Sequence, residues 1–141
     1  MLRGAFIFII LCALFSGCGR GGNSAPVSGL VTLNGKPVAG IAVSFQPVVT
    51  EGNIAPGPAA FGVTGADGRY VAQLMGETRK GAAIGKNQVR FSVYMPPDDP
   101  DTPSKAKPAV QIPARYWSDS KLELDVPAKG TATADFQLTS P

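Results

Sequence analysis

Apolar and polar residues alternate in short stretches along the chain from Val27 onward. Such alternation points every second side chain to the same face, which is typical of a β-strand with one buried face. The clearest stretch is 87–95, in which Val89, Phe91 and Val93 face one way and Arg90, Ser92 and Tyr94 the other. On this pattern we expect seven strands, at residues 27–33, 41–47, 61–64, 69–74, 87–95, 122–126 and 134–138.

The same alternation predicts which side chains fill the core. In most of the expected strands the larger apolar side chains share one face, and that face should be buried. The expected core residues are Val27, Val31, Leu33, Ile41, Val43, Phe45, Tyr70, Ala72, Leu74, Val89, Phe91 and Val93.

Two dipeptides predict tight turns. Asn34-Gly35 is the strongest short hairpin signal, because a type I′ turn needs a positive φ at both central residues. It favours an antiparallel pair formed by the first two expected strands. Asp67-Gly68 is the hairpin signal of a second expected turn, at residues 65–68. Asp67 could instead belong to a calcium loop, but the alternating acidic residues of an EF-hand are absent around it.

Turns rather than helix-length segments separate nearly all of the expected strands. The 141 residues include 17 Gly and 13 Pro, which favours short strands joined by many turns. Outside the N-terminal segment, no apolar period of 3.6 residues persists. Seven alternating strands in about 115 residues predict an all-β fold, and specifically one antiparallel Greek-key β-sandwich domain over residues 27–141. An open barrel is the alternative.

The N-terminal segment has the pattern of an export signal. Arg3 precedes an apolar run over residues 5–15, and the small residues Ser16 and Gly17 follow it. This order predicts a signal peptide over residues 1–17. The run is shorter than the roughly 20 residues of a membrane span, although an uncleaved anchor helix is the alternative.

The letters "LFSGC" at residues 14–18 resemble the bacterial lipobox, in which a small residue precedes a cysteine that receives a diacylglyceryl group. Phe15 occupies the position where Leu is usual. The resemblance implies that Cys18 is lipidated and is the first residue of the mature protein. A plain secretory signal is the alternative. Residues 18–26 are rich in Gly and Ser and are expected to form a flexible tether.

This resemblance also implies a location and a partner. The protein should be anchored by lipid to a membrane of the cell envelope and should face the periplasm or the cell exterior. Gly19 rather than Asp follows the cysteine, which in some Gram-negative bacteria permits export to the outer membrane.

Composition excludes several classes of chemistry. The chain has no histidine, which excludes histidine-based acid–base catalysis and most zinc and copper sites. Cys12 lies inside the apolar run, so the domain has no disulfide framework. The net charge is +3 and its basic residues are scattered, which does not indicate a nucleic-acid partner. We expect no catalytic residues, no metal and no cofactor.

Two acidic groups are candidate sites. Asp98, Asp99 and Asp101 lie in a proline-rich segment and could bind a divalent cation weakly, but a solvated loop is the better interpretation. Glu123 and Asp125 share the outward face of one expected strand. Paired carboxylates hydrolyse glycosides only within a pocket, and an exposed strand does not supply one.

The best candidates for ligand binding are aromatic. Tyr94, Arg115, Tyr116 and Trp117 could form a platform for a glycan or a surface for an envelope protein. The alternative is that Tyr116 fills the open end of the sandwich and Trp117 covers its rim.

The stretch "VSGLVTLNGKPVAGIAVSFQP" resembles the opening of carboxypeptidase-regulatory-like domains, which have a transthyretin-like (prealbumin-like) sandwich. The matching residues are Val27, Gly29, Val31, Gly35, Lys36, Pro37, Gly40, Val43 and Phe45. "TGADGRYVAQL" is similar to their second signature through Thr64, Gly68 and Tyr70. "GKNQVRFSV" takes the place of a later strand, with Asn87 where an aromatic residue is common. "IPARYW…SKLELDV" is like a segment of small bacterial lipoproteins that carry this domain.

The resemblance implies a fold rather than an activity. One enzymatic branch of transthyretin-like proteins, the hydroxyisourate hydrolases, relies on histidines and a C-terminal Tyr-Arg-Gly-Ser tail. This chain has no histidine and ends in "LTSP". The expected function is therefore a non-catalytic structural or binding role in the cell envelope, with a carbohydrate-binding module as the alternative.

Overall fold

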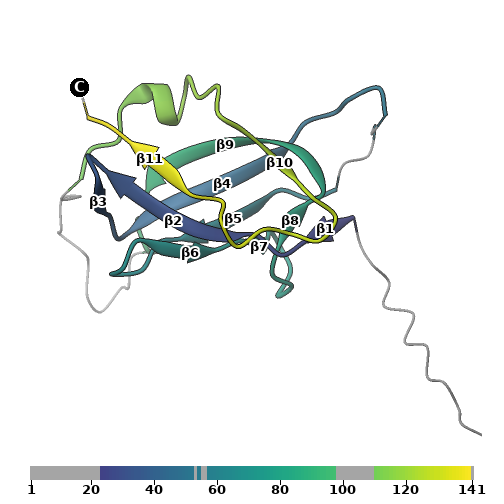
Figure 1. Ribbon diagram of the computed structural model, residues 1–141, viewed down its shortest axis with the longest axis horizontal. Helices are drawn as coiled ribbons and strands as arrows, with labels where there is room; N and C mark the ends of the chain where they lie inside the picture. The colour runs from purple at the N-terminus through teal and green to yellow at the C-terminus, as the bar shows by residue number, and fades with distance from the viewer. Residues whose placement is uncertain (1–22, 53, 55–56, 98–109, 141) are drawn as a thin grey trace, which may run out of the picture.

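The computed structural model describes residues 23–52, 54, 57–97 and 110–140, and these form an all-β fold (Figure 1). The expected signal peptide, Cys18 and the Asp98–Asp101 group lie outside the described residues. The strands are β1 (Ser24–Ala25), β2 (Ser28–Leu33), β3 (Lys36–Pro37), β4 (Ile41–Pro47), β5 (Ala60–Val63), β6 (Arg69–Val71), β7 (Gln73–Leu74), β8 (Ala82–Ala83), β9 (Gly85–Val93), β10 (Glu123–Val126) and β11 (Phe136–Leu138). A short 3₁₀-helix, η1 (Ala114–Tyr116), lies between β9 and β10.

The strands form two main sheets and one small one. The larger sheet is antiparallel and has the order β10-β9-β4-β5-β7. The second sheet has the order β11-β2-β3, and β6 also pairs with β2. The small sheet pairs β1 with β8. All of these pairs are antiparallel except β11 with β2, which is parallel, so the expectation of a purely antiparallel fold is wrong at this pair.

The parallel pair arises because the last part of the chain returns to the beginning of β2 and then follows it. Thr131 forms a parallel bridge with Val27, and Phe136 is the partner of Val31. Because Thr131 already lies beside the start of β2, the chain that continues into β11 follows β2 in the same direction.

The two main sheets are joined at one edge by the segment 69–74. Its first part, β6, pairs with β2, and its second part, β7, pairs with β5. Ala72 lies between the two parts and donates its N–H to the carbonyl oxygen of Val27. The one strand expected here is therefore divided between two sheets. This segment connects the two main sheets at one edge.

The Asn34-Gly35 turn forms as predicted but joins different strands. Both residues have positive φ, at 52° and 80°, and the turn pairs β2 with β3. After β3 the chain crosses to the other sheet at Gly40, where φ is 71°. The predicted pairing of 27–33 with 41–47 is wrong, because β4 pairs with β5 and β9. A two-residue turn determines the pairing of the residues that follow it directly, and here these are only Lys36 and Pro37.

The predicted core is confirmed, and it fills the space between the sheets. Ten of the twelve expected residues are buried, while Leu33 and Val93 are partly buried at its edge. Phe45 stacks on Tyr70 with ring centroids 6.1 Å apart, and Phe91 meets the edge of Phe136 at 5.1 Å. Burial of a phenylalanine side chain contributes about 1.5–3 kcal/mol to folding.

The residues just before Val27 also belong to the fold. Ser24 and Ala25 form β1, and Ala25 is only 3% exposed. The carbonyl oxygen of Asn23 accepts a hydrogen bond from the N–H of Ile84. Residues 23–26, which the sequence assigned to a tether, are therefore part of the domain's edge.

Candidate functional site: the aromatic surface around η1

The segment 110–122 carries three of the four candidate binding residues. Within it η1 begins after Pro113, whose φ of −60° is compatible with the first turn of a helix. The N–H groups of Trp117 and Asp119 both donate to the carbonyl oxygen of Ala114 and close the turn. Figure 1 shows η1 near the end of β11 and on the same side of the fold as β9.

Arg115 and Tyr116 hold the end of the last strand. The Arg115 guanidinium lies 4.9 Å from the centroid of the Tyr116 ring and donates to the carbonyl oxygen and the hydroxyl of Thr139. The N–H of Thr139 donates to the Tyr116 hydroxyl over 3.1 Å. The Tyr116 ring meets Phe91 edge-on, with centroids 6.4 Å apart. These contacts engage the Tyr116 hydroxyl and one guanidinium nitrogen of Arg115 within the fold.

The same contacts change the acidity of Tyr116. The Thr139 hydroxyl, the Arg115 side chain and the Thr139 N–H, in that order of importance, lower the pKa of Tyr116 to about 8. Hydrogen bonds donated to a phenolate favour the charged form, and a nearby guanidinium adds to the effect. A hollow of about 460 Å³ adjoins this group and is lined by Arg115, Tyr116, Asp119, Lys121 and Leu122. The arrangement gives an acidic phenol at the surface.

Trp117 lies in a different hollow. Its side chain is 49% exposed and helps to line a depression of about 370 Å³. The other lining residues are Ser92, Val93, Val110, Gln111 and Ile112. This hollow is largely apolar, with one hydroxyl and one amide in its lining.

Tyr94 stands apart from both hollows. It follows the end of β9, is 41% exposed and donates its N–H to the carbonyl oxygen of Gly40. It lines neither the hollow of Trp117 nor that of Tyr116. The structure therefore brings Arg115 and Tyr116 together, places Trp117 beside a second hollow and leaves Tyr94 separate.

The acidic candidates are explained by turns and surface contacts. A turn is present at Asp67-Gly68: the Asp67 carboxylate accepts a hydrogen bond from the N–H of Arg69, and Gly68 has a φ of 75°. Asp67 does not have a positive φ, so this turn differs in type from the one at Asn34-Gly35. Glu123 is exposed and lies 3.4 Å from the Lys86 ammonium. Among the residues that the structure describes, no three His, Cys, Asp or Glu side chains are grouped closely enough to hold a metal ion.

Sequence patterns did not predict the role of the buried polar residues. Asn87 is fully buried in β9 and donates to the carbonyl oxygens of Ala83 and Gly85. Ser120 links the segment after η1 to β9 through the carbonyl oxygen of Val89. Asn87 stands where the domains that the sequence resembles commonly have an aromatic residue, which marks this position as unusual. That difference did not indicate which groups the Asn87 amide would contact.

Tyr70 was expected in the core, although its hydroxyl has a contact that alternation does not predict. The hydroxyl donates to the carbonyl oxygen of Ala134 over 2.7 Å. Burial, together with the charge of Asp135, raises the pKa of Tyr70 well above its usual value. Tyr70 therefore stays a neutral donor that fastens the returning chain to the core.

Within the ranges that the structure describes, none of the helices has the length and apolar character needed to cross a bilayer. Comparison of the chain with protein-family models, with curated proteins and with solved structures finds no significant match.

Proposed function

We propose that this chain is a non-catalytic lipoprotein of the cell envelope, anchored through a lipid on Cys18, whose β-domain has a structural or binding role. The domain would be a variant of the transthyretin-like sandwich of carboxypeptidase-regulatory-like domains. It would face the periplasm or the cell exterior.

The observation that carries this proposal is the position of the cysteine relative to the domain. Cys18 follows the apolar run and the small residues of "LFSG", and the ordered chain is already in place at Asn23. A lipid on Cys18 would therefore hold the domain directly at the membrane. The contacts that the Tyr116 hydroxyl and one guanidinium nitrogen of Arg115 make with Thr139 support a structural role for these two side chains.

The anchor is tested by replacing each cysteine of the full-length protein in turn. Cys18→Ser should move the protein from the membrane fraction to the soluble fraction and abolish incorporation of a labelled fatty acid, because the acceptor thiol is lost. Cys12→Ser is the matched control, since Cys12 lies inside the expected signal, and it should leave both measurements unchanged. Membrane association that survives Cys18→Ser would indicate an uncleaved helix and would contradict the proposal.

The geometry gives less support to the alternative function, a carbohydrate-binding module. Stacking platforms for sugars need aromatic faces that one ligand can reach together, whereas Trp117 and Tyr116 line different hollows and Tyr94 lines neither. Trp117 and Tyr94 both keep exposed rings, but they are not brought together at one hollow.

A further inference from the structure

Covalent geometry limits how far the domain can move from its anchor. Asn23 is the fifth residue after Cys18, and five fully extended residue steps span at most about 18 Å. If Cys18 carries the lipid, as proposed above, Asn23 is held within that distance of the bilayer surface. The end of the domain that contains Asn23 must then lie close to the lipid headgroups.

Two loops are located at this end. Ala83 in β8 is the partner of Ser24, and the loop between β7 and β8 is tied to the residues before β5, because the N–H of Met75 donates to the carbonyl oxygen of Ala59. The loop after β4 also reaches Asn23: a methyl group on Gly57 would lie 3.9 Å from the Asn23 carbonyl oxygen. Figure 1 shows β1 and β8 between the two loops, with the loop after β4 projecting above them and the loop between β7 and β8 below.

Both loops expose large apolar side chains. Val49 and Ile54, in the loop after β4, are 65% and 81% exposed. Met75, in the loop between β7 and β8, is 55% exposed. Exposed apolar side chains that lie singly on a surface need no explanation, but these three are on the elements that the anchor would hold against a membrane.

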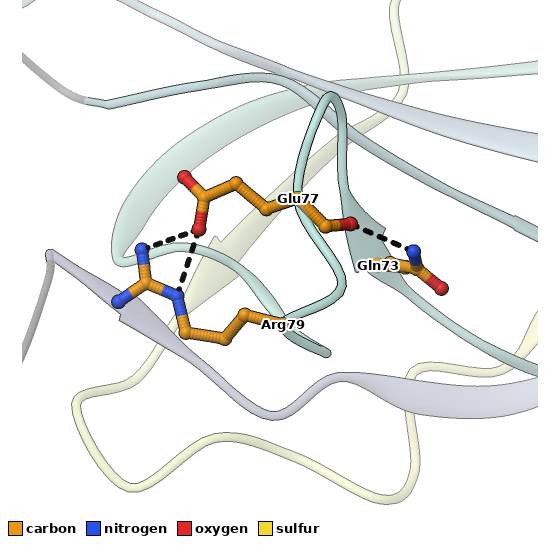
Figure 2. Close-up of polar contacts among 3 residues, drawn as sticks. All are labelled: Gln73, Glu77 and Arg79. Carbon is orange, nitrogen blue, oxygen red and sulfur yellow. Dashed lines mark hydrogen bonds and ion pairs between the residues drawn. The ribbon is translucent and has the colours of Figure 1, made fainter.

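The loop that carries Met75 is held in shape by its own polar contacts. Figure 2 shows Arg79 paired with the Glu77 carboxylate, at 2.9 Å, and the Gln73 amide donating to the Glu77 carbonyl oxygen at 2.7 Å. The ion pair neutralises the charge of the two side chains, which lowers the cost of bringing the loop to a lipid surface. Lys80 follows in the same loop and suits an anionic headgroup.

We propose that Val49, Ile54 and Met75 form a membrane-facing end that rests on the bilayer and fixes the orientation of the lipidated domain. β9 begins near this end and runs nine residues, or about 30 Å, away from it. Tyr94, Met95 and the Trp117 hollow lie at its far end. The membrane-facing end would thus direct the Trp117 hollow away from the lipid, toward partners in the surrounding space.

Two exposed methionines at opposite ends of the domain allow a matched test. Met75→Cys and Met95→Cys are each labelled with a maleimide dye that responds to polarity, in the full lipidated protein; the thioether on Cys18 leaves the introduced thiol as the reactive one. The proteins are reconstituted into vesicles of phosphatidylethanolamine and phosphatidylglycerol. The dye at position 75 should emit at shorter wavelength and lose fluorescence to nitroxide-labelled lipid, whereas the dye at position 95 should do neither.

The outcomes separate this inference from the proposed function. A protein that is lipidated and floats with the vesicles, but gives the same emission and quenching at positions 75 and 95, would overturn the membrane-facing end alone. A protein without lipid on Cys18 that does not float would overturn both proposals. Val49→Cys provides a second reporter in the other loop and should behave like Met75→Cys.

Discussion

Tyr116 is the residue with the most distinctive chemistry on the described surface. Because its folded pKa is about 8 and the ordinary value is 10, the unfolded state binds more protons between these two pH values. Stability contributed by this group therefore rises as pH increases from about 8 to 10, and it is lost as pH falls through about 8.

The cause of this shift can be tested by removing one hydroxyl. Thr139→Val should raise the Tyr116 pKa part of the way toward 10, because the Thr139 N–H and Arg115 remain as stabilising groups. A spectrophotometric titration of the phenolate absorbance measures the change. Tyr94→Phe is the control and should leave the phenolate transition near pH 8 in place. A wild-type protein in which no tyrosine titrates below about 9.5 would contradict the assignment.

The division of Tyr116 and Trp117 between two hollows also belongs to the residue scale. Their adjacency in the sequence suggested a common platform, but Tyr116 is the last residue of η1, whereas Trp117 follows the helix with a φ of −125° and lines the other hollow. The aromatic residues could be recognised from the sequence, whereas the placement of Tyr116 and Trp117 at two different hollows depended on the local turn at Ala114–Tyr116. The contacts with Thr139 depended on the position of β11, which is distant in the chain.

At the scale of elements, β2 depends on a glycine that admits the returning chain. A Cβ atom at Gly29 would collide with the carbonyl group of Ala134. Strand propensity alone would favour alanine over glycine by about 0.5–1 kcal/mol. Overpacking against backbone costs about 1–3 kcal/mol or more, so the collision outweighs the gain in propensity and alanine at this position should destabilise the fold.

Gly29→Ala should therefore lower the free energy of unfolding by about 1–3 kcal/mol in urea denaturation. Gly52→Ala is a matched control, because nothing lies within 4 Å of a Cβ atom at that exposed position. It should change the free energy of unfolding by no more than about 0.5 kcal/mol. Equal stabilities of the two variants would show that the Ala134 segment does not lie against β2 as described.

The strands and their buried faces could be predicted from the sequence because alternation is a local property. The type of turn at Asn34-Gly35 was also local, since it requires positive φ at both residues. The partner of each strand was not local. The crossing at Gly40 and the parallel approach beside Gly29 are determined by how the sheets pack, and no short stretch of sequence carries that information.

At the scale of the whole molecule, the two sheets share structural elements. The segment 69–74 supplies β6 to one sheet and β7 to the other, so neither sheet can separate without breaking backbone hydrogen bonds of this segment. The Phe45–Tyr70 and Phe91–Phe136 contacts add side-chain packing within the shared core. The sequence predicted one strand here, and its division is what makes the sheets interdependent.

This sharing predicts that the domain unfolds as one cooperative unit. Trp117 is the one tryptophan of the chain, so its fluorescence reports on the hollow beside Val93, while far-ultraviolet circular dichroism reports on all of the strands. In urea, the two signals of the unanchored Cys18→Ser protein should change with the same midpoint. Gly29→Ala should shift both curves together, although Gly29 and the Trp117 hollow are on different elements. Separate midpoints, or a shift confined to the circular dichroism curve, would show that the sheets unfold independently and that the 69–74 segment does not couple them.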